Sequence, residues 1–225
     1  MLTGTVAWSM KEVLAVHVLR LAVGLFLVQV VYPSLFNATQ TIIEVTDRLV
    51  IVLLVWLVLR RHGEEFGVYG ARKELVRNAM LGLLAGVVLL GVSIFSERVY
   101  STVMHIVPSQ HPLVVWVKNA STLSDLAVPL FLAGVAAPIA EEVLYRLFTF
   151  PVLKERFGLW GGAVGSAAIF ALFHFNAYWL AEIIVVGTCL ALLYYWTGSL
   201  VSAIIAHSVI NSAKIMLIYL GVTLI

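Results

Sequence analysis

The feature that most constrains this chain is a series of long apolar segments separated by short polar gaps. We identify seven of them, at 12–36, 41–60, 78–96, 124–151, 159–176, 178–196 and 199–223. A helix needs about 20 mostly apolar residues to cross a bilayer, and each segment approaches or exceeds that length. The chain is 62% hydrophobic and only 12% charged, which is more apolar than soluble domains of this size are. The sequence therefore predicts an all-α fold, a polytopic membrane helix bundle of about seven transmembrane helices.

The polar gaps divide the chain into two parts of one membrane domain, 1–225. Residues 1–119 would supply N-terminal transmembrane helices and an interfacial loop, and residues 120–225 would supply the helices that carry the candidate site. We place the loop at 97–123, where Pro108 and Pro112 interrupt the apolar pattern, and we allow it a short amphipathic helix. The segment at 41–60 is the weakest of the set, because charged residues crowd its start.

The Lys and Arg residues of the short gaps predict how the chain sits in the membrane. Cytoplasmic loops carry an excess of these cations. With a cytoplasmic N-terminus, eight fall inside and three outside. The inside set is Lys11, Arg60, Arg61, Arg72, Lys73, Arg77, Lys154 and Arg156, and the outside set is Arg48, Arg98 and Lys118. We therefore expect an integral, multi-pass membrane protein with a cytoplasmic N-terminus, located in the cell membrane if the organism is prokaryotic.

The same cations form no long basic tract, so we expect membrane lipid and no nucleic acid among the partners. The oligomeric state is left open. Four further polar residues, His17, Arg20, Glu182 and Lys214, lie within apolar segments. We expect those near helix ends to extend to the membrane interface, as long polar side chains commonly do.

Two adjacent carboxylates, Glu141 and Glu142, lie in the fourth apolar segment. A charge at the centre of a bilayer costs roughly 2.5–3.5 kcal/mol on insertion scales. Glu142 and Arg146 have the i,i+4 spacing of one helix face, so they can pair and offset much of that cost. Glu141 points about 100° away and has no such partner in its own helix. An unpaired carboxylate in an apolar site is a candidate general base.

A histidine in the fifth segment can meet this carboxylate. His174 lies one helical turn after Phe170, which could form a wall of the same pocket. The short turn at 154–158 joins the fifth segment to the fourth. Counted from this turn, Glu141 and His174 reach similar depths, so they can face each other in a hairpin.

The seventh segment adds His207 and Asn211, again with the i,i+4 spacing of one face. Their N–H donors suit the oxyanion of a tetrahedral intermediate. A lone histidine in a membrane helix is more often a hydrogen-bonding residue between helices than a catalyst. Carboxylates, histidines and an amide on three separate segments are harder to explain in this way, so we favour a catalytic site.

These residues resemble the motifs of the CAAX-protease and bacteriocin-processing (CPBP) family of intramembrane endopeptidases. That family's motifs are EExxxR, FxxxH and HxxxN. They appear here, in the family's order, as Glu141-Glu142-xxx-Arg146, Phe170-xxx-His174 and His207-xxx-Asn211. The resemblance covers about the C-terminal half of the chain, from roughly residue 120 onward. Leu147 departs from it, because many members have glycine after the arginine.

The resemblance implies an enzyme, an intramembrane protease. Glu141 would activate the attacking water together with His174, and His207 and Asn211 would stabilise the oxyanion. Supporting roles would fall to Glu142, Arg146 and Phe170. The substrate would be a membrane-associated or lipidated peptide or protein, and a prenylated CAAX-type protein is one form of it.

The family is often described as a family of metalloproteases, and the sequence leaves the role of a metal open. It contains no H-E-x-x-H motif and no cysteine cluster. Glu141, His174 and His207 could supply three ligands with an open fourth position, so zinc remains an alternative. We expect no obligatory metal, and a water activated by glutamate in its place.

Other functions also fit a polar site in a membrane bundle. A non-catalytic scaffold, or a bacteriocin-immunity or regulatory protein, would bind a partner through the same helices without cutting it. A proton-coupled transporter would use buried Glu and His as a relay. The sequence shows no inverted repeat and no matching pair of interrupted helices, which argues against a transporter. A purely structural bundle would lose only stability when Glu141, His174 or His207 is replaced.

Overall fold

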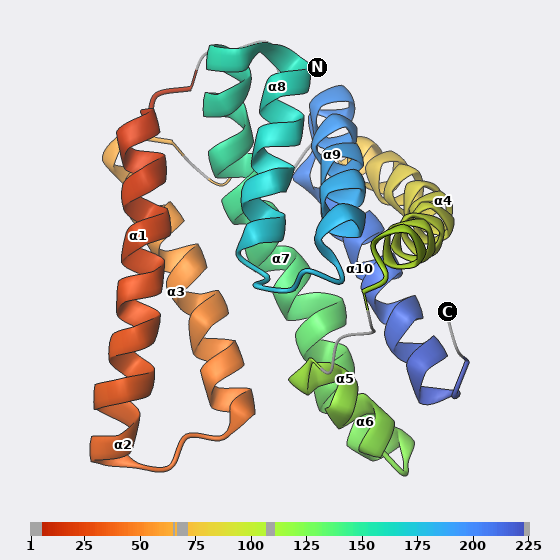
Figure 1. Ribbon diagram of the computed structural model, residues 1–225. Helices are drawn as coiled ribbons and strands as arrows, with labels where there is room; N and C mark the ends of the chain where they lie inside the picture. Colours follow the sequence, from red (N-terminus) through yellow and green to blue (C-terminus); the bar gives the residue numbers. More distant parts are fainter. Residues whose placement is uncertain (1–5, 65, 67–71, 107–110, 223–225) are drawn as a thin grey trace.

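A computed structural model describes residues 6–64, 66, 72–106 and 111–222, and these residues form a helical bundle without strands (Figure 1). The α-helices are α1 (Met10–Phe26), α2 (Tyr32–Leu35), α3 (Gln40–Arg61), α4 (Arg72–Met104), α5 (Pro112–Asn119), α6 (Leu123–Phe131), α7 (Ala137–Glu142), α8 (Phe150–Leu172), α9 (Leu180–Thr197) and α10 (Leu200–Tyr219). Three π-helical segments interrupt them, η1 (Leu27–Val31), η2 (Leu132–Ala136) and η3 (Val143–Thr149). The predicted all-α fold is confirmed.

Five of the described helical segments are long and apolar enough to cross a membrane. They are Met10–Leu35, Glu74–Met104, Leu123–Leu172, Leu180–Thr197 and Leu200–Tyr219. The segment Leu123–Leu172 has 50 residues and turns back at Gly158, where φ is 74°, a left-handed conformation that suits glycine. It therefore holds two of the predicted passes, and α3 corresponds to the weak segment at 41–60. The prediction of a polytopic membrane bundle is confirmed.

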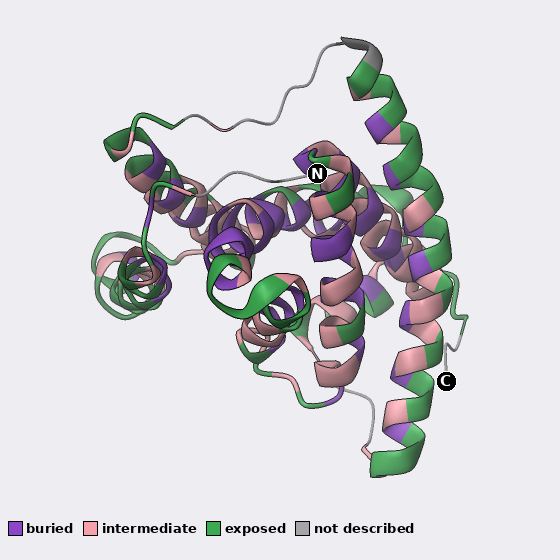
Figure 2. Ribbon diagram, turned by 90° about the horizontal axis from the view of Figure 1, so that it is seen from above, coloured by how far each residue is buried: buried purple, intermediate pink, exposed green. Residues whose placement is uncertain are grey.

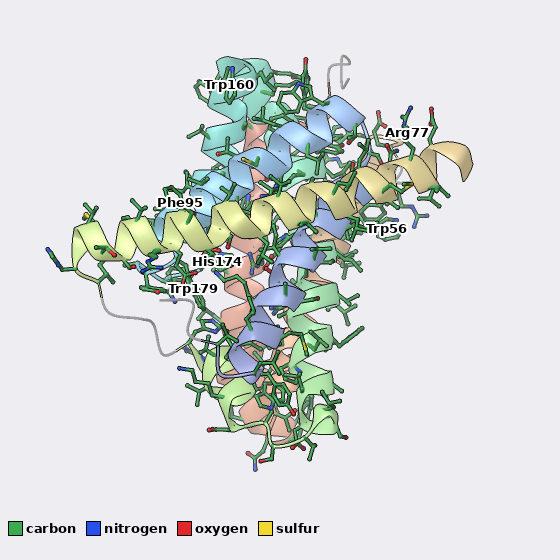
Figure 3. The ribbon with its side chains drawn as sticks, turned by 90° about the vertical axis from the view of Figure 1, so that its right-hand side faces the viewer. Trp56, Arg77, Phe95, Trp160, His174 and Trp179 are labelled. Carbon is green, nitrogen blue, oxygen red and sulfur yellow. The ribbon has the colours of Figure 1, made fainter. Side chains whose placement is uncertain are left out.

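The outward faces of these helices are apolar. Figure 2 shows buried residues gathered in the centre of the bundle and exposed residues along the outer helices. Among the exposed side chains are Val88 and Phe95 of α4 and Trp160 of α8 (Figure 3). Large exposed apolar patches are rare on soluble monomers, and a lipid environment accounts for them. The chain is an integral membrane protein.

Helix α4 is longer than the segment predicted at 78–96. It continues to Met104, so the predicted loop at 97–123 is wrong in its first part, and Glu97 lies within a helix. The helix continues because Val99 and Val103 extend its apolar outer surface. The short helix allowed in that loop is present as α5. In Figure 3, α4 crosses α9 and α10 obliquely.

Small residues let α4 approach α10 closely. A Cβ atom at Gly82 would lie 2.6 Å from the carbonyl oxygen of Ser202, and one at Gly86 would lie 2.7 Å from Cβ of Val209. Close backbone approach at small residues is a common way for membrane helices to associate. This contact fixes the position of α10, which carries part of the candidate site.

The core of the bundle is built on the chain between α7 and α8. Leu144, Tyr145 and Phe148 of η3 are almost completely buried there, as is Phe150 at the start of α8, against residues of α1, α3, α9 and α10. Dense packing holds side chains in fixed rotamers. The two adjacent glutamates thus lie next to this densely packed core.

Candidate active site

Helix α7 carries Glu141 and Glu142 between the π-helical segments η2 and η3. Pro138 lies in the first turn of α7 and has no N–H to continue the α-helical hydrogen bonding of the turn before it. The wider π-helical turns absorb this interruption, and such turns are frequent at functional sites. The helix geometry therefore changes on both sides of the two carboxylates.

Glu142 is completely buried and joins three helical segments. Its Oε1 lies 3.0 Å from Nη1 of Arg146, the i,i+4 pair that the spacing predicted. The same oxygen accepts a hydrogen bond of 2.8 Å from Nδ1 of His207 on α10. Nη2 of Arg146 donates to the carbonyl oxygen of Gly187 on α9, at 3.2 Å. The pair thus ties η3 to α9 and α10.

Phe170 lies at the centre of the site. Its ring makes T-shaped contacts with His174, at 4.7 Å between ring centroids, and with His207, at 5.8 Å. The guanidinium carbon of Arg146 lies over the same ring, 4.8 Å from its centroid, in a cation–π contact. Phe170 therefore packs against the buried Arg146 and against both histidines.

His174 follows the last turn of α8. Its Nδ1 lies 2.9 Å from the carbonyl oxygen of Phe170. A carbonyl oxygen can only accept, so Nδ1 must carry the proton, and in the neutral ring Nε2 is left as an acceptor. This tautomer is the one that a general base needs.

Glu141 and Asn211 complete the predicted set. The Glu141 side chain is 17% exposed, and its Oε2 lies 3.7 Å from Nε2 of His207. Nδ2 of Asn211 donates to the carbonyl oxygen of Ala133, at 3.0 Å. An amide nitrogen has two protons, so Asn211 keeps a second N–H that this bond does not use.

One cavity of about 350 Å³ brings these residues together. Glu141, Phe170, His174, His207 and Asn211 all line it, whereas Glu142 and Arg146 lie behind the wall. Figure 3 places His174 and Trp179 near mid-height of the bundle. Further polar or aromatic residues, which the sequence did not assign to a site, also line the cavity: Arg20, Glu44, Asp47, Arg48, His111, Trp179, Glu182 and Lys214.

Several of these residues were expected at the membrane interface, and that expectation is wrong for Arg20, Glu182 and Lys214. Nη2 of Arg20 lies 3.0 Å from Oδ2 of Asp47. Nζ of Lys214 donates to Glu97 and Glu182, at 2.5 and 2.8 Å. Internal partners offset the cost of burying these charges, so the side chains do not need to extend to water. In the sequence, only their charge within apolar segments could have indicated that these residues belong to the site.

His111 belongs to the cavity wall although it lies in the predicted loop. Its Nδ1 accepts a hydrogen bond from the N–H of Leu113, at 3.2 Å, and so caps α5. The ring lies 5.2 Å from that of Trp179. Burial lowers the pKa of His111, and the nearby His174 and Arg48 lower it further. The ring therefore favours the neutral form that the cap requires.

The three residues considered as zinc ligands, Glu141, His174 and His207, line the same cavity. Among the described side chains, however, no group of three His, Cys, Asp or Glu residues has an arrangement that could hold a metal ion. The described side chains, as they are placed, form no metal centre, so we derive no step through one.

Residues 123–213 match the family model described as type II CAAX prenyl endopeptidase Rce1-like. The matched segment contains all three motifs, from Glu141 to Asn211. This chain carries a CPBP-family protease domain. No curated protein and no solved structure gives a significant match to the chain.

The CPBP domain begins at the first residue of α6, Leu123, and ends within α10. The match supports, in general terms, a CAAX-type intramembrane protease. The division of the chain at residue 120 and the individual roles of the site residues stay predictions. Lys214 and Glu97 lie outside the segment that matches the CPBP family.

Proposed function

We propose that this CPBP protein is an endopeptidase that cleaves a peptide bond of a membrane-associated or lipidated substrate, CAAX-type prenylated proteins included. The observation that supports this most is the single cavity lined by Glu141, His174, His207 and Asn211. These residues come from α7, from the end of α8 and from α10. A carboxylate, two imidazoles and an amide around one hollow space are what peptide hydrolysis by an activated water requires.

Glu141 and His174 activate the water in this proposal. A water molecule between them gives a proton to the Glu141 carboxylate, while Nε2 of His174 accepts a hydrogen bond from it and orients it. The hydroxide oxygen forms a bond with the carbonyl carbon. The proton then passes from Glu141 to the leaving nitrogen as the C–N bond breaks, so one carboxylate serves as base and then as acid.

His207 and Asn211 stabilise the negative charge on the carbonyl oxygen. The Nδ1–H of His207 is used by Glu142, so the ring would donate to the oxyanion through its other nitrogen, Nε2. The second N–H of Asn211 supplies another donor. Because both residues are on one face of α10 and are held by bonds to α7 and η2, the donors are fixed before the substrate binds.

A second cavity of about 340 Å³ supports a lipidated substrate. It lies between α1 and α3 and is walled largely by apolar residues such as Leu21, Leu25 and Val28. Arg20 and Phe173 line both cavities, so the two adjoin. An acyl or prenyl chain in the second cavity would leave its peptide in the first.

The test is cleavage of quenched fluorescent peptides by purified protein in detergent, with a prenylated cysteine or without it. Glu141→Gln keeps the shape of the side chain and removes its basicity, so we expect turnover to fall by about 100-fold or more. Glu155→Gln makes the same change at an exposed position and serves as the control. No cleavage by folded wild-type protein would instead favour a scaffold, and equal turnover by the wild-type and Glu141→Gln proteins would show that Glu141 is not the base.

A further inference from the structure

Lys214 lies on the same face of α10 as two of the proposed catalytic residues. His207, Asn211 and Lys214 follow one another at i, i+4 and i+7, and all three line the first cavity. Ile218 continues the same row. A peptide whose carbonyl is held at His207 and Asn211 therefore passes Lys214 if it runs along α10.

The Lys214 ammonium is paired with two carboxyl groups. Its Nζ donates to Oε2 of Glu97 at 2.5 Å and to Oε1 of Glu182 at 2.8 Å. The same Glu182 oxygen accepts a hydrogen bond from the hydroxyl of Ser93. The side chains of Glu97 and Glu182 are each only 9% exposed. We call Lys214, Glu97 and Glu182 the α10 triad; two carboxyl groups share one ammonium, so a second cation could pair with one of them.

Among the described residues, the opposite wall of the cavity supplies no further cation to the triad. There Arg20 pairs with Asp47, and Arg48 pairs with Glu44 and Asp47. Two cations and two carboxylates balance one another on that wall. Charges in a buried site are screened less than charges in water, so two carboxyl groups that share one ammonium would attract a basic side chain of a bound peptide strongly.

The position of the triad selects one residue of the substrate. Lys214 lies seven residues after His207, which is about 10 Å along the helix axis. An extended peptide covers about 3.3 Å per residue. The triad is therefore about three residues from the carbonyl that is attacked.

We propose that the α10 triad determines specificity by favouring a basic side chain, and disfavouring a carboxylate, about three residues before the cleaved bond. The inference rests on the proposed peptidase function. It also assigns a direction to the substrate. The terminal carboxylate of a CAAX-type tripeptide would be repelled by the triad, so the tripeptide points towards the wall with Arg20 and Arg48.

The experiment measures kcat/KM for three prenylated peptides that carry Lys, Gln or Glu three residues before the cleaved bond. For the wild-type protein we expect the order Lys, Gln, Glu, with the Lys peptide cleaved about 10-fold or more better than the Glu peptide. Glu182→Gln removes one negative charge and should bring this ratio close to one. Glu97→Gln acts on the same ammonium from outside the cavity and should lower the ratio as well.

Glu44→Gln is the matched control, because it removes the same charge from the cavity wall at α3 and should leave the ratio high. Thermal unfolding in detergent shows whether each variant is folded. If one triad variant does not fold, the charge preference is measured on the other. A ratio unchanged in both triad variants overturns the inference, and so does a charge preference that appears three residues after the bond instead. If the wild-type protein cleaves none of the peptides, the proposed function itself fails; cleavage that ignores charge overturns the triad alone.

Discussion

Glu142 and His207 are joined by a hydrogen bond of 2.8 Å, although 65 residues separate them in the chain. The imidazole Nδ1 donates, and the accepting oxygen also lies 3.0 Å from the guanidinium of Arg146. One carboxylate oxygen therefore connects a buried ion pair with the histidine proposed for the oxyanion. This makes Glu142 a positioning residue for His207, in addition to a partner for Arg146.

Glu142→Gln should destabilise the protein strongly, because it leaves the Arg146 guanidinium buried without its carboxylate. Removing one partner of a buried ion pair costs about 3–5 kcal/mol. The double variant Glu142→Gln/Arg146→Gln should recover part of this stability, and its cleavage rate should stay low because His207 has lost its charged acceptor. Thermal unfolding and single-turnover cleavage would be measured on both variants. If the double variant recovered both stability and cleavage, Glu142 would have a structural role only and would not position His207.

Asn211→Ala should lower kcat by about 100- to 1,000-fold with little change in KM, because a donor to the oxyanion acts mainly in the transition state. The bond to the Ala133 carbonyl is also lost, at a cost of about 1 kcal/mol. Asn211→Asp should be at least as inactive, since a carboxylate repels the oxyanion. A variant whose KM rises while kcat is kept would place Asn211 in substrate binding instead.

Metal removal should leave turnover within about two-fold of the untreated enzyme, since the proposed base is the Glu141 carboxylate acting directly on water. The measurement is cleavage before and after treatment with a strong chelator, together with the metal content of the purified protein. Loss of activity that zinc restores, with zinc bound in a ratio near one, would show that Glu141, His174 and His207 act as ligands after all.

Acidification should weaken the cap of α5. The lowered pKa of His111 means that the folded protein favours the neutral ring. Its contribution to stability is therefore present above the unperturbed pKa of about 6.5 and is lost as the pH falls below that value. His111→Asn keeps an acceptor for the N–H of Leu113 and does not titrate in this range.

The measurement is the thermal unfolding midpoint at about pH 7.5 and about pH 5.5, on either side of the unperturbed value. The wild-type midpoint should fall further on acidification than that of His111→Asn. The charged or titratable neighbours Glu44, Arg48 and His174 are the same in both proteins, so the difference reports on His111. Equal falls would mean that the cap is not sensitive to pH.

The contact between α4 and α10 can be tested with two substitutions on one helix. Gly82→Ala places a methyl group 2.6 Å from the Ser202 carbonyl oxygen and should cost about 1–3 kcal/mol, as overpacking does. Gly91→Ala is the control, because no atom lies within 4 Å of its added methyl group. Its stability should be equal or slightly higher, since alanine favours the helix. Equal effects on the thermal midpoint would rule out close packing at Gly82.

Some features of the site follow from spacing along one helix. The pairing of Glu142 with Arg146 depends only on an interval of four residues, and the structure has it. The different environments of Glu141 and Glu142 follow from the 100° between adjacent residues: one lines the cavity and the other is buried. The row from His207 to Lys214 is likewise a property of helical periodicity.

Contacts between helices could not be predicted in the same way. The expectation that Lys214 and Glu182 extend to the interface was wrong, because each is the other's partner and both meet α4. The loop predicted at 97–123 began too early in the chain, so Glu97 was not recognised as a residue of a helix. The bond from His207 to Glu142 was not foreseen either, since nothing in the spacing indicates which nitrogen faces which carboxylate.

A helical membrane bundle with a CPBP-type set of residues could be predicted from the sequence alone, because hydropathy, helix length and motif spacing are local properties of the chain. The tertiary structure decided which polar groups meet: His207 with Glu142, and Lys214 with Glu97 and Glu182. The physical reason is that these helices are apolar on most of their surface. In such helices the hydrophobic pattern does not mark the inward face, and only packing at small residues and pairing of buried charges fix it.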